Sequence, residues 1–251
     1  MNVELIVAVI ALAVIAVTFI VMWFRSRTPR TGSNRRRIQN ILGDKYEIGH
    51  ELGRGMNAIT FRVKRVEKSN MPLVAKVLLT PEDEPRITHS SFRRHVERFI
   101  KEMTNLERLQ NSKFIVPVYA FHANELQPFF VMKYCETSLE QKMENRILSI
   151  QEILDVLLDI CQGLTECHSN DIIHRDLKPA NILKYEGRWV LADFGMSLLG
   201  NEGSMVTVPE SLPGTIPYTA PEVMYYQPDR IGPQADIFSL GVTIKEMLTG
   251  T

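Results

Sequence analysis

Three short polar motifs follow one another in the second half of the chain. The first is His-Arg-Asp-Leu-Lys-Pro-Ala-Asn at 174–181, and the second is Asp-Phe-Gly at 193–195, directly after an apolar strand candidate. The third, Ala-Pro-Glu at 220–222, closes the segment that begins with Asp-Phe-Gly. Aspartate and asparagine oxygens at strand or loop ends suit Mg²⁺, and a lysine close behind an aspartate can neutralise a phosphoryl group. The order and spacing of the motifs therefore indicate chemistry on phosphate rather than chance.

The first half adds a glycine-rich turn and a lysine within an apolar strand. Gly53-Arg54-Gly55 lies between two strand candidates, and by itself it is equally compatible with an ordinary hairpin turn. Glycines let backbone N–H groups approach phosphate oxygens, while strands on both sides exclude a Rossmann or Walker loop, which opens a helix. Lys76 needs an anionic partner inside its strand, and Glu102 is the best carboxylate candidate.

The apolar pattern predicts a strand-rich part followed by a helical part. Strands are expected at 46–52, 59–66, 73–79, 114–122, 129–134 and 189–192. Helices are expected over 91–110, where apolar residues recur every three or four positions, and over 236–248. A further helix begins after Ser149, where Glu152 completes a capping box. This order indicates an α+β fold.

Taken together, the motifs resemble those of the eukaryotic protein kinase family over residues 44–251. The resemblance implies a two-lobed α+β fold: a small antiparallel β lobe with one helix at 44–134, and a larger, mostly helical lobe at 135–251. It implies ATP and Mg²⁺ as cofactors and transfer of the γ-phosphate to serine or threonine hydroxyls of proteins. Lys178 and Gly214-Thr215 resemble the serine/threonine type rather than the tyrosine type.

The resemblance assigns the nucleotide site to residues of both expected lobes. Lys76 would hold the α- and β-phosphates in a pair with Glu102, and Glu97 is the alternative partner. The other nucleotide contacts would be the glycines over the phosphates (Gly53 and Gly55), the side chains around adenine (Ala75 and Leu183), and the hinge with its gate residue (Met132, Lys133, Tyr134 and Cys135).

The resemblance likewise assigns the catalytic roles. Asp176 would accept the proton of the substrate hydroxyl, and Lys178 would stabilise charge on the transferred group. Two residues would bind Mg²⁺, Asn181 and Asp193, and two would support the catalytic loop, Thr215 and Asp236.

Regulation and substrate preference follow from neighbouring residues. Arg175, beside the catalytic aspartate, indicates control by phosphorylation of the activation segment, because an arginine there pairs well with a phosphate. An upstream kinase would act on Ser211, with Thr207 and Ser204 as alternatives, while an unmodified loop is the simpler interpretation. Ala180, where many arginine-directed members carry glutamate, predicts no strong preference for basic substrates.

The N-terminus carries an apolar run at 5–24 in which Thr18 is the only polar side chain. As a helix, twenty residues span about 30 Å, the hydrocarbon thickness of a bilayer. A cleaved signal peptide, the alternative, would need positive charge before the run, whereas six arginines follow it within 25–37. We therefore expect a single-pass anchor at 1–24 with its N-terminus outside or lumenal. An Arg-rich linker at 25–43 and a cytosolic remainder would follow.

Charge and cysteine content exclude other classes of protein. From residue 38 onward the chain has 23 basic and 28 acidic residues, so the basic footprint of a nucleic-acid-binding domain is absent. The three cysteines form no C-x-x-C pair, which disfavours a disulfide framework or a zinc site.

The sequence departs from the family pattern in three places. Ala58 replaces the third glycine and Thr60 the usual valine, so somewhat weaker nucleotide affinity is expected. The sequence also stops at Thr251, so by the resemblance we expect an incomplete helical lobe in which apolar residues of 236–248 are short of cover. A fragment of a longer protein is the favoured interpretation.

Two other functions stay open. A pseudokinase or scaffold would share the fold with little or no turnover, although intact Lys76, Asp176, Asn181 and Asp193 argue against it. A lipid or small-molecule kinase would share parts of the fold, although Ala-Pro-Glu and Gly214-Thr215 favour a protein acceptor.

Overall fold

The computed structural model describes residues 31–55, 57–66, 71–123, 127–144, 146–196, 198–199, 216–225 and 227–250. The chain divides into two compact units, Met1–Gly43 and Asp44–Thr251. In the first unit, part of the predicted linker forms the helix α2 (Thr31–Leu42). The apolar run at 5–24, and with it the expected membrane anchor, lies outside the described residues. Among those described, no helix is both long and apolar enough to cross a membrane.

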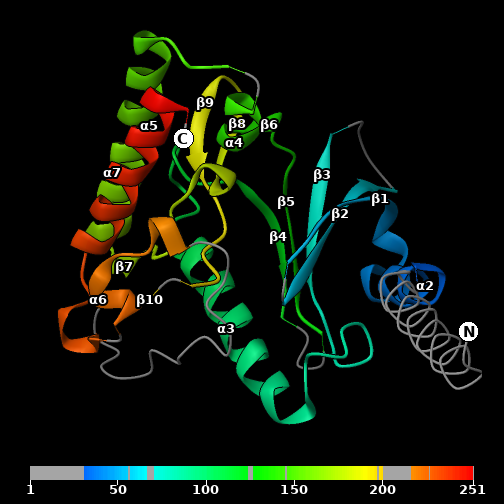
Figure 1. The fold of residues 1–251 in the computed structure, drawn as a ribbon. Coiled ribbons are helices and arrows are strands. Elements are labelled where there is room, and N and C mark those ends of the chain that lie inside the picture. The colour runs from blue at the N-terminus through cyan, green and yellow to red at the C-terminus, as the bar shows by residue number, and fades with distance from the viewer. Residues whose placement is uncertain are drawn as a thin grey trace, which may run out of the picture. The chain divides into compact units, whose positions relative to one another are not determined.

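An antiparallel sheet of five strands begins the second unit (Figure 1). The strands pair in the order β1-β2-β3-β5-β4. Their bounds are β1 (Tyr46–Arg54), β2 (Ala58–Arg65), β3 (Leu73–Leu78), β4 (Val118–His122) and β5 (Phe129–Lys133). In β2 the apolar residues Ile59, Phe61 and Val63 are buried, and the polar residues between them are more exposed, as expected for a strand with one face on the core.

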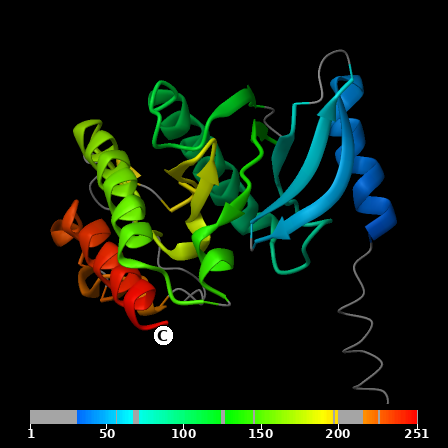
Figure 2. The ribbon, with the colours of Figure 1, turned by 90° about the horizontal axis from the view of Figure 1, so that it is seen from above.

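The predicted helix at 91–110 is confirmed as α3 (His89–Arg108), although it starts two residues earlier. Thr88 is its N-cap, and Ser91 completes a capping box that the sequence interpretation missed. Phe99, Met103 and Leu106 are buried at spacings of three and four, and the Phe99 ring lies 5.6 Å from that of Phe130 in β5. In Figure 2, α3 lies between the sheet and the helical part of the unit.

The predicted strand at 114–122 is wrong in its first half. Only Val118–His122 pairs with β5. Residues 114–116 instead bond to Leu191: the Leu191 N–H donates to the Phe114 carbonyl over 2.8 Å, and the Val116 N–H donates to the Leu191 carbonyl over 2.9 Å. Pro117 lies at the change of partner: its carbonyl accepts the Lys133 N–H of β5 over 2.9 Å, but it has no N–H of its own to donate. This segment therefore joins the first sheet to the strands of the helical part.

The helical part contains two long helices that lie side by side, α5 and α7 (Figure 1). Its helices are α4 (Leu139–Met143), α5 (Ile150–Ser169), α6 (Pro221–Met224) and α7 (Gln234–Thr249). Short strands pair as β6-β8-β9 and as β7-β10, namely β6 (Thr137–Ser138), β8 (Ile182–Tyr185), β9 (Arg188–Leu191), β7 (Ile172–Ile173) and β10 (Leu198–Leu199). The predicted capping box of Ser149 and Glu152 at the start of α5 is confirmed.

Close packing brings α5 onto β9. A Cβ added at Gly163 would lie 3.0 Å from Leu191 Cδ1 and 3.1 Å from the Phe114 carbonyl oxygen, so a glycine suits this contact. The expectation that α7 lacks cover holds for one face only. Ile237 and Leu248 are 56% and 49% exposed, whereas Leu240 and Met247 are buried.

Candidate functional site

Three charged residues from distant parts of the sequence meet beside the sheet. Lys76 in β3 donates to Glu102 Oε1 of α3 over 2.6 Å and to Asp193 Oδ1 over 2.9 Å. Glu102 is buried, whereas the Asp193 side chain keeps 45% of its surface exposed. The structure thus brings Glu102, not Glu97, to Lys76. Glu97 lies on the exposed side of α3, where it pairs with Arg93.

The charges of this cluster depend on one another. Burial alone would lower the pKa of Lys76, but the carboxylates of Asp193 and Glu102 raise it above its ordinary value. Lys76 in turn lowers the pKa of Asp193 to about 2. For Glu102, burial outweighs the attraction of Lys76 and raises its pKa to about 7. Lys76 and Asp193 therefore carry opposite charges at neutral pH. The pKa of Glu102 is close to neutral pH, so small changes in its surroundings decide whether this carboxyl is ionised.

The catalytic-loop residues form a second cluster. Lys178 Nζ donates to Asp176 Oδ2 over 2.9 Å, and Asn181 Nδ2 donates to the same oxygen over 2.9 Å. Burial raises the pKa of Asp176 above its ordinary value, against the effect of the Lys178 ammonium. A carboxylate held in this way has the properties of a proton acceptor in a reaction.

Asp236 holds the backbone of the catalytic loop in place. It is fully buried at the start of α7, and it accepts the backbone N–H groups of His174 and Arg175 over 2.9 and 2.8 Å. Its Oδ2 also lies 2.8 Å from His168 Nε2. Arg175 has a φ of 62° and Asp193 one of 63°, a conformation that non-glycine residues adopt only where their surroundings fix it.

A buried histidine links the catalytic loop to the Asp-Phe-Gly motif. His174 Nε2 lies 3.0 Å from the Ala192 carbonyl oxygen, and the ring of His174 lies 4.7 Å from that of Phe194. Both side chains are fully or almost fully buried. The two motifs are therefore packed as one unit.

The strand register places one of the predicted adenine contacts, Ala75, on the face of the sheet opposite Lys76. Val74 and Lys76 pair with Met132 and Phe130 in β5, so all four lie on one face of the sheet. Ala75 alternates with them and faces the other way, fully buried, which separates it from Lys76. Sequence reasoning did not name Val74, which shares the face of Lys76, although the period of two along β3 was a signal that could have found it.

The hinge residues span the end of β5: Met132 and Lys133 are its last two residues, and Tyr134 and Cys135 follow it. Lys133 ends that strand, and the Tyr134 N–H donates to the Pro72 carbonyl over 3.0 Å. Arg62 of β2 lies over the Tyr134 ring, 3.8 Å from its centre. Burial raises the pKa of the Cys135 thiol to about 12. Leu183, in β8, is half-buried and packs against the main hydrophobic cluster.

The glycine-rich turn connects β1 to β2. The Gly55 N–H donates to the Ala58 carbonyl over 2.8 Å, which closes the turn. Gly53 lies opposite Thr60 in the strand register. Thr215 and Gly214, together with the candidate phosphorylation sites Ser204, Thr207 and Ser211, lie outside the described residues.

Asn181 and Asp193 suit a magnesium ion by their chemistry. Asn181 donates through Nδ2 to Asp176, which leaves its amide oxygen as the acceptor, and the Asp193 carboxylate is ionised and partly exposed. Both offer the hard oxygen ligands that Mg²⁺ prefers. Within the described ranges, no group of three or more histidine, cysteine, aspartate or glutamate side chains could hold a metal.

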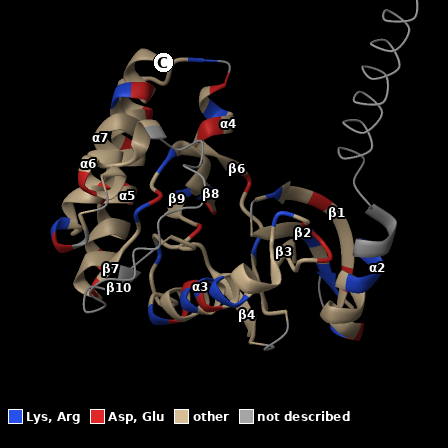
Figure 3. Cartoon of the chain, turned by 60° about the horizontal axis from the view of Figure 1, so that its bottom comes forward, with Lys and Arg blue, Asp and Glu red and all other residues tan. Residues whose placement is uncertain are grey.

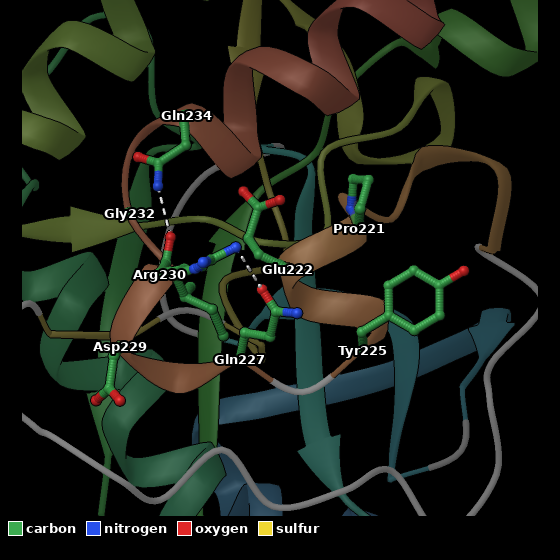
Figure 4. A pocket seen from close by; sticks show the side chains of 9 residues that line it. Pro221, Glu222, Tyr225, Gln227, Asp229, Arg230, Gly232 and Gln234 are labelled. Atoms are coloured by element: carbon green, nitrogen blue, oxygen red, sulfur yellow. Dashed lines mark hydrogen bonds between the residues drawn. The ribbon is translucent and has the colours of Figure 1, made fainter.

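A separate hollow of about 720 Å³ lies between α6 and the start of α7 (Figure 4). Glu222 lines it. Nearby, the Arg230 side chain donates to Gln227 Oε1 over 3.3 Å, and the Gln234 side chain donates to the backbone carbonyl of Arg230 over 2.5 Å. In the described part of the chain, Glu222 has no side-chain hydrogen bond or ion pair. None of the expected ATP-binding residues lines this hollow.

Comparisons with known proteins agree with this geometry. The model of the protein kinase domain matches residues 46–251. The serine/threonine-protein kinase MPS1 of Encephalitozoon cuniculi is 28% identical over 222 residues, which cover 88% of this chain and 36% of that protein. The serine/threonine-protein kinase PknB of Mycobacterium tuberculosis is 31% identical over 218 residues, which cover 83% of this chain and 33% of that protein.

The chain thus spans about a third of the length of these relatives. A probable serine/threonine-protein kinase from Clostridium acetobutylicum is 29% identical over 219 residues, with 85% of this chain covered. The family model extends over most of the chain and includes every residue of the clusters described above. The chain belongs to the protein kinase family.

Proposed function

We propose that the protein transfers the γ-phosphate of ATP to serine or threonine hydroxyls of other proteins. The observation that carries this proposal is the position of Lys76, which bridges Glu102 and Asp193. A lysine held between two carboxylates presents a fixed positive charge to the phosphates of a bound nucleotide. The serine/threonine assignment is supported by the names of the relatives.

The chain's own residues account for the chemical step. Asp176 accepts the proton of the acceptor hydroxyl while the hydroxyl oxygen forms a bond to the γ-phosphorus and the bond to ADP breaks. Lys178, 2.9 Å from Asp176, offsets charge on the transferred group. Mg²⁺, when held by Asn181 and Asp193, would supply further neutralisation of the phosphates.

The test is a phosphate-transfer assay with the full chain, radiolabelled ATP and a protein substrate, followed by phosphoamino-acid identification. We expect phosphoserine or phosphothreonine, and a loss of at least about 100-fold in Asp176→Asn. Asp155→Asn, on an exposed part of α5, is the matched control and should keep full activity. Normal ATP binding without transfer would support the pseudokinase instead, and label in lipid alone would support a lipid kinase.

We further propose that phosphorylation of the activation segment regulates the enzyme. Arg175 is half-buried, and its Nε has no hydrogen-bond partner within the described residues. Burial lowers its pKa, Asp236 opposes that shift, and the nearby Arg98 of α3 adds to it. Lys101, also on α3, has its own pKa lowered by burial and by Arg175. Charged residues recur along this helix (Figure 3). Three neighbouring cations favour a phosphate between them.

Mass spectrometry of active protein tests this regulatory proposal. We expect phosphate on Ser211, or on Thr207 or Ser204, and a loss of activity on phosphatase treatment. Fully active protein that carries no phosphate between 196 and 215 would refute it.

We also propose that residues 5–24 anchor the protein in a membrane, with the N-terminus outside or lumenal and the kinase unit in the cytosol. The apolar length and the arginines that follow it support this topology. The protein should resist extraction from cell membranes by alkaline carbonate, and residues 44–251 should be open to protease in intact cytosol-side-out vesicles. Release by carbonate would contradict the anchor.

A further inference from the structure

The glycine-rich turn is fixed to its surroundings at several points. Besides the bond that closes the turn, the Leu79 N–H donates to the Asn57 carbonyl over 2.8 Å. On the other side, Thr60 Oγ1 donates to the Gly53 carbonyl over 3.1 Å. The first two bonds use backbone atoms alone, whereas the third depends on one side chain.

The Thr60 hydroxyl acts where the strand pairing is irregular. The register between β1 and β2 shifts between Glu51 and Gly53, which marks a β-bulge that loosens the ladder just before the turn. The hydroxyl lies against Gly53, since a Cβ added there would be 3.3 Å from Thr60 Oγ1. Thr60 therefore joins the two strands at the point where backbone pairing is irregular.

The strand register places the Thr60 side chain toward the nucleotide. Thr60 pairs with Lys76 of β3, and directly opposite residues of antiparallel strands point to the same face. The face that carries Lys76 is the one expected to hold the phosphates. Because threonine is branched at Cβ, its χ1 angle is restricted, so the hydroxyl is held toward Gly53 with little rotational freedom to lose.

We propose that Thr60 is a positioning residue for the nucleotide phosphates: its hydroxyl holds the glycine-rich turn in the position that covers them. The inference deepens the proposed function and rests on it. If the turn is already ordered before the nucleotide binds, the free-energy cost of ordering it on binding is smaller. The sequence alone favours the opposite expectation, namely that a hydroxyl in place of valine weakens nucleotide affinity.

The experiment compares ADP with adenosine as ligands of the full chain in the presence of Mg²⁺. Thr60→Val removes the donor but keeps the branched shape, and Thr60→Ser keeps the donor. Thr165→Val is the matched control, because Thr165 makes a similar hydrogen bond, to the Cys161 carbonyl over 2.7 Å, on the exposed side of α5. Dissociation constants are measured by calorimetry, and KM values for ATP and for the protein substrate by initial rates.

We expect Thr60→Val to weaken ADP binding and raise the KM for ATP by about 2- to 10-fold, the size of one net hydrogen bond. Adenosine binding and the KM for the protein substrate should stay unchanged. Thr60→Ser keeps the donor but not the branch at Cβ, so it should lose less ADP affinity than Thr60→Val, and Thr165→Val should behave as the unmodified chain. Unchanged or tighter ADP binding in Thr60→Val would overturn the inference, as would an equal loss for adenosine. If the unmodified chain bound neither ADP nor ATP, the proposed function itself would fail, and this inference with it.

Discussion

Replacing Asp236 by asparagine tests whether this one carboxylate supports the catalytic loop. Asp236 is fully buried, and its two oxygens receive hydrogen bonds from the His174 and Arg175 backbones and from His168. Asparagine has nearly the same shape, but one of its two terminal atoms is an NH₂ donor. Whichever way the amide turns, an N–H group then faces another N–H group.

The magnitude follows from the number of bonds lost. In the better orientation the asparagine oxygen keeps the two contacts of Oδ2, and the bond from the Arg175 N–H is lost. A hydrogen bond to a charged acceptor contributes about 1.5–3 kcal/mol, and a buried donor without a partner costs about 1–3 kcal/mol. We expect a loss of about 3–4 kcal/mol in the free energy of unfolding. That corresponds to a decrease of roughly 6–16 °C in Tm for a unit of this size.

The assay combines thermal unfolding with phosphate transfer at a temperature where both proteins are folded. Because the Arg175 backbone carries the adjacent Asp176, a small shift of the loop should lower kcat by about 100-fold. Asp155→Asn, an exposed change of the same chemistry on α5, should shift Tm by less than about 2 °C. If Asp236→Asn melted within 2 °C of the unmodified protein and kept its activity, the argument from buried hydrogen bonds would be refuted.

Three further predictions concern single positions. Ser149→Ala removes the N-cap of α5 and should cost about 1 kcal/mol in urea unfolding, and no measurable loss would contradict the cap. Gly163→Ala gains helix propensity but places a Cβ 3.1 Å from the Phe114 carbonyl oxygen, so we expect a net loss of roughly 1 kcal/mol in the free energy of urea unfolding. A gain in that free energy would show that the contact relaxes. Because its pKa is about 12, the Cys135 thiol should react with iodoacetamide at pH 8 far more slowly than exposed Cys161, and equal rates by peptide mapping would contradict its burial.

Much of the candidate site could be predicted from residue type and order. Lys76 in an apolar strand requires an anion, and that requirement pointed to Glu102, which the structure places 2.6 Å away. Local rules also located the start of α5, because a capping box involves residues only three apart. Such features depend on neighbours in the sequence, or on a motif whose chemistry permits few arrangements.

The remaining features depend on contacts that no local pattern specifies. The segment 114–116 is apolar enough for the first sheet, but Pro117 ends that pairing and Leu191, far along the chain, provides another. Ala75 was assigned to adenine by resemblance, whereas the register of β3 against β5 places Val74, not Ala75, on the same face as Lys76. The bond from Thr60 to Gly53 likewise depends on a bulge that neither strand shows in its sequence.

The two buried carboxylates of the site are stabilised in different ways, and their functions differ accordingly. Both oxygens of Asp236 accept N–H groups of the loop that it supports. The carboxylate is therefore occupied within the fold and is not available to a ligand. Glu102 is buried against Lys76, which also pairs with the partly exposed Asp193. A cation shared by one buried and one exposed carboxylate keeps a fixed position while its second partner stays accessible. Support of the catalytic loop and the proposed positioning of phosphates are therefore separate tasks, which depend on separate charged groups.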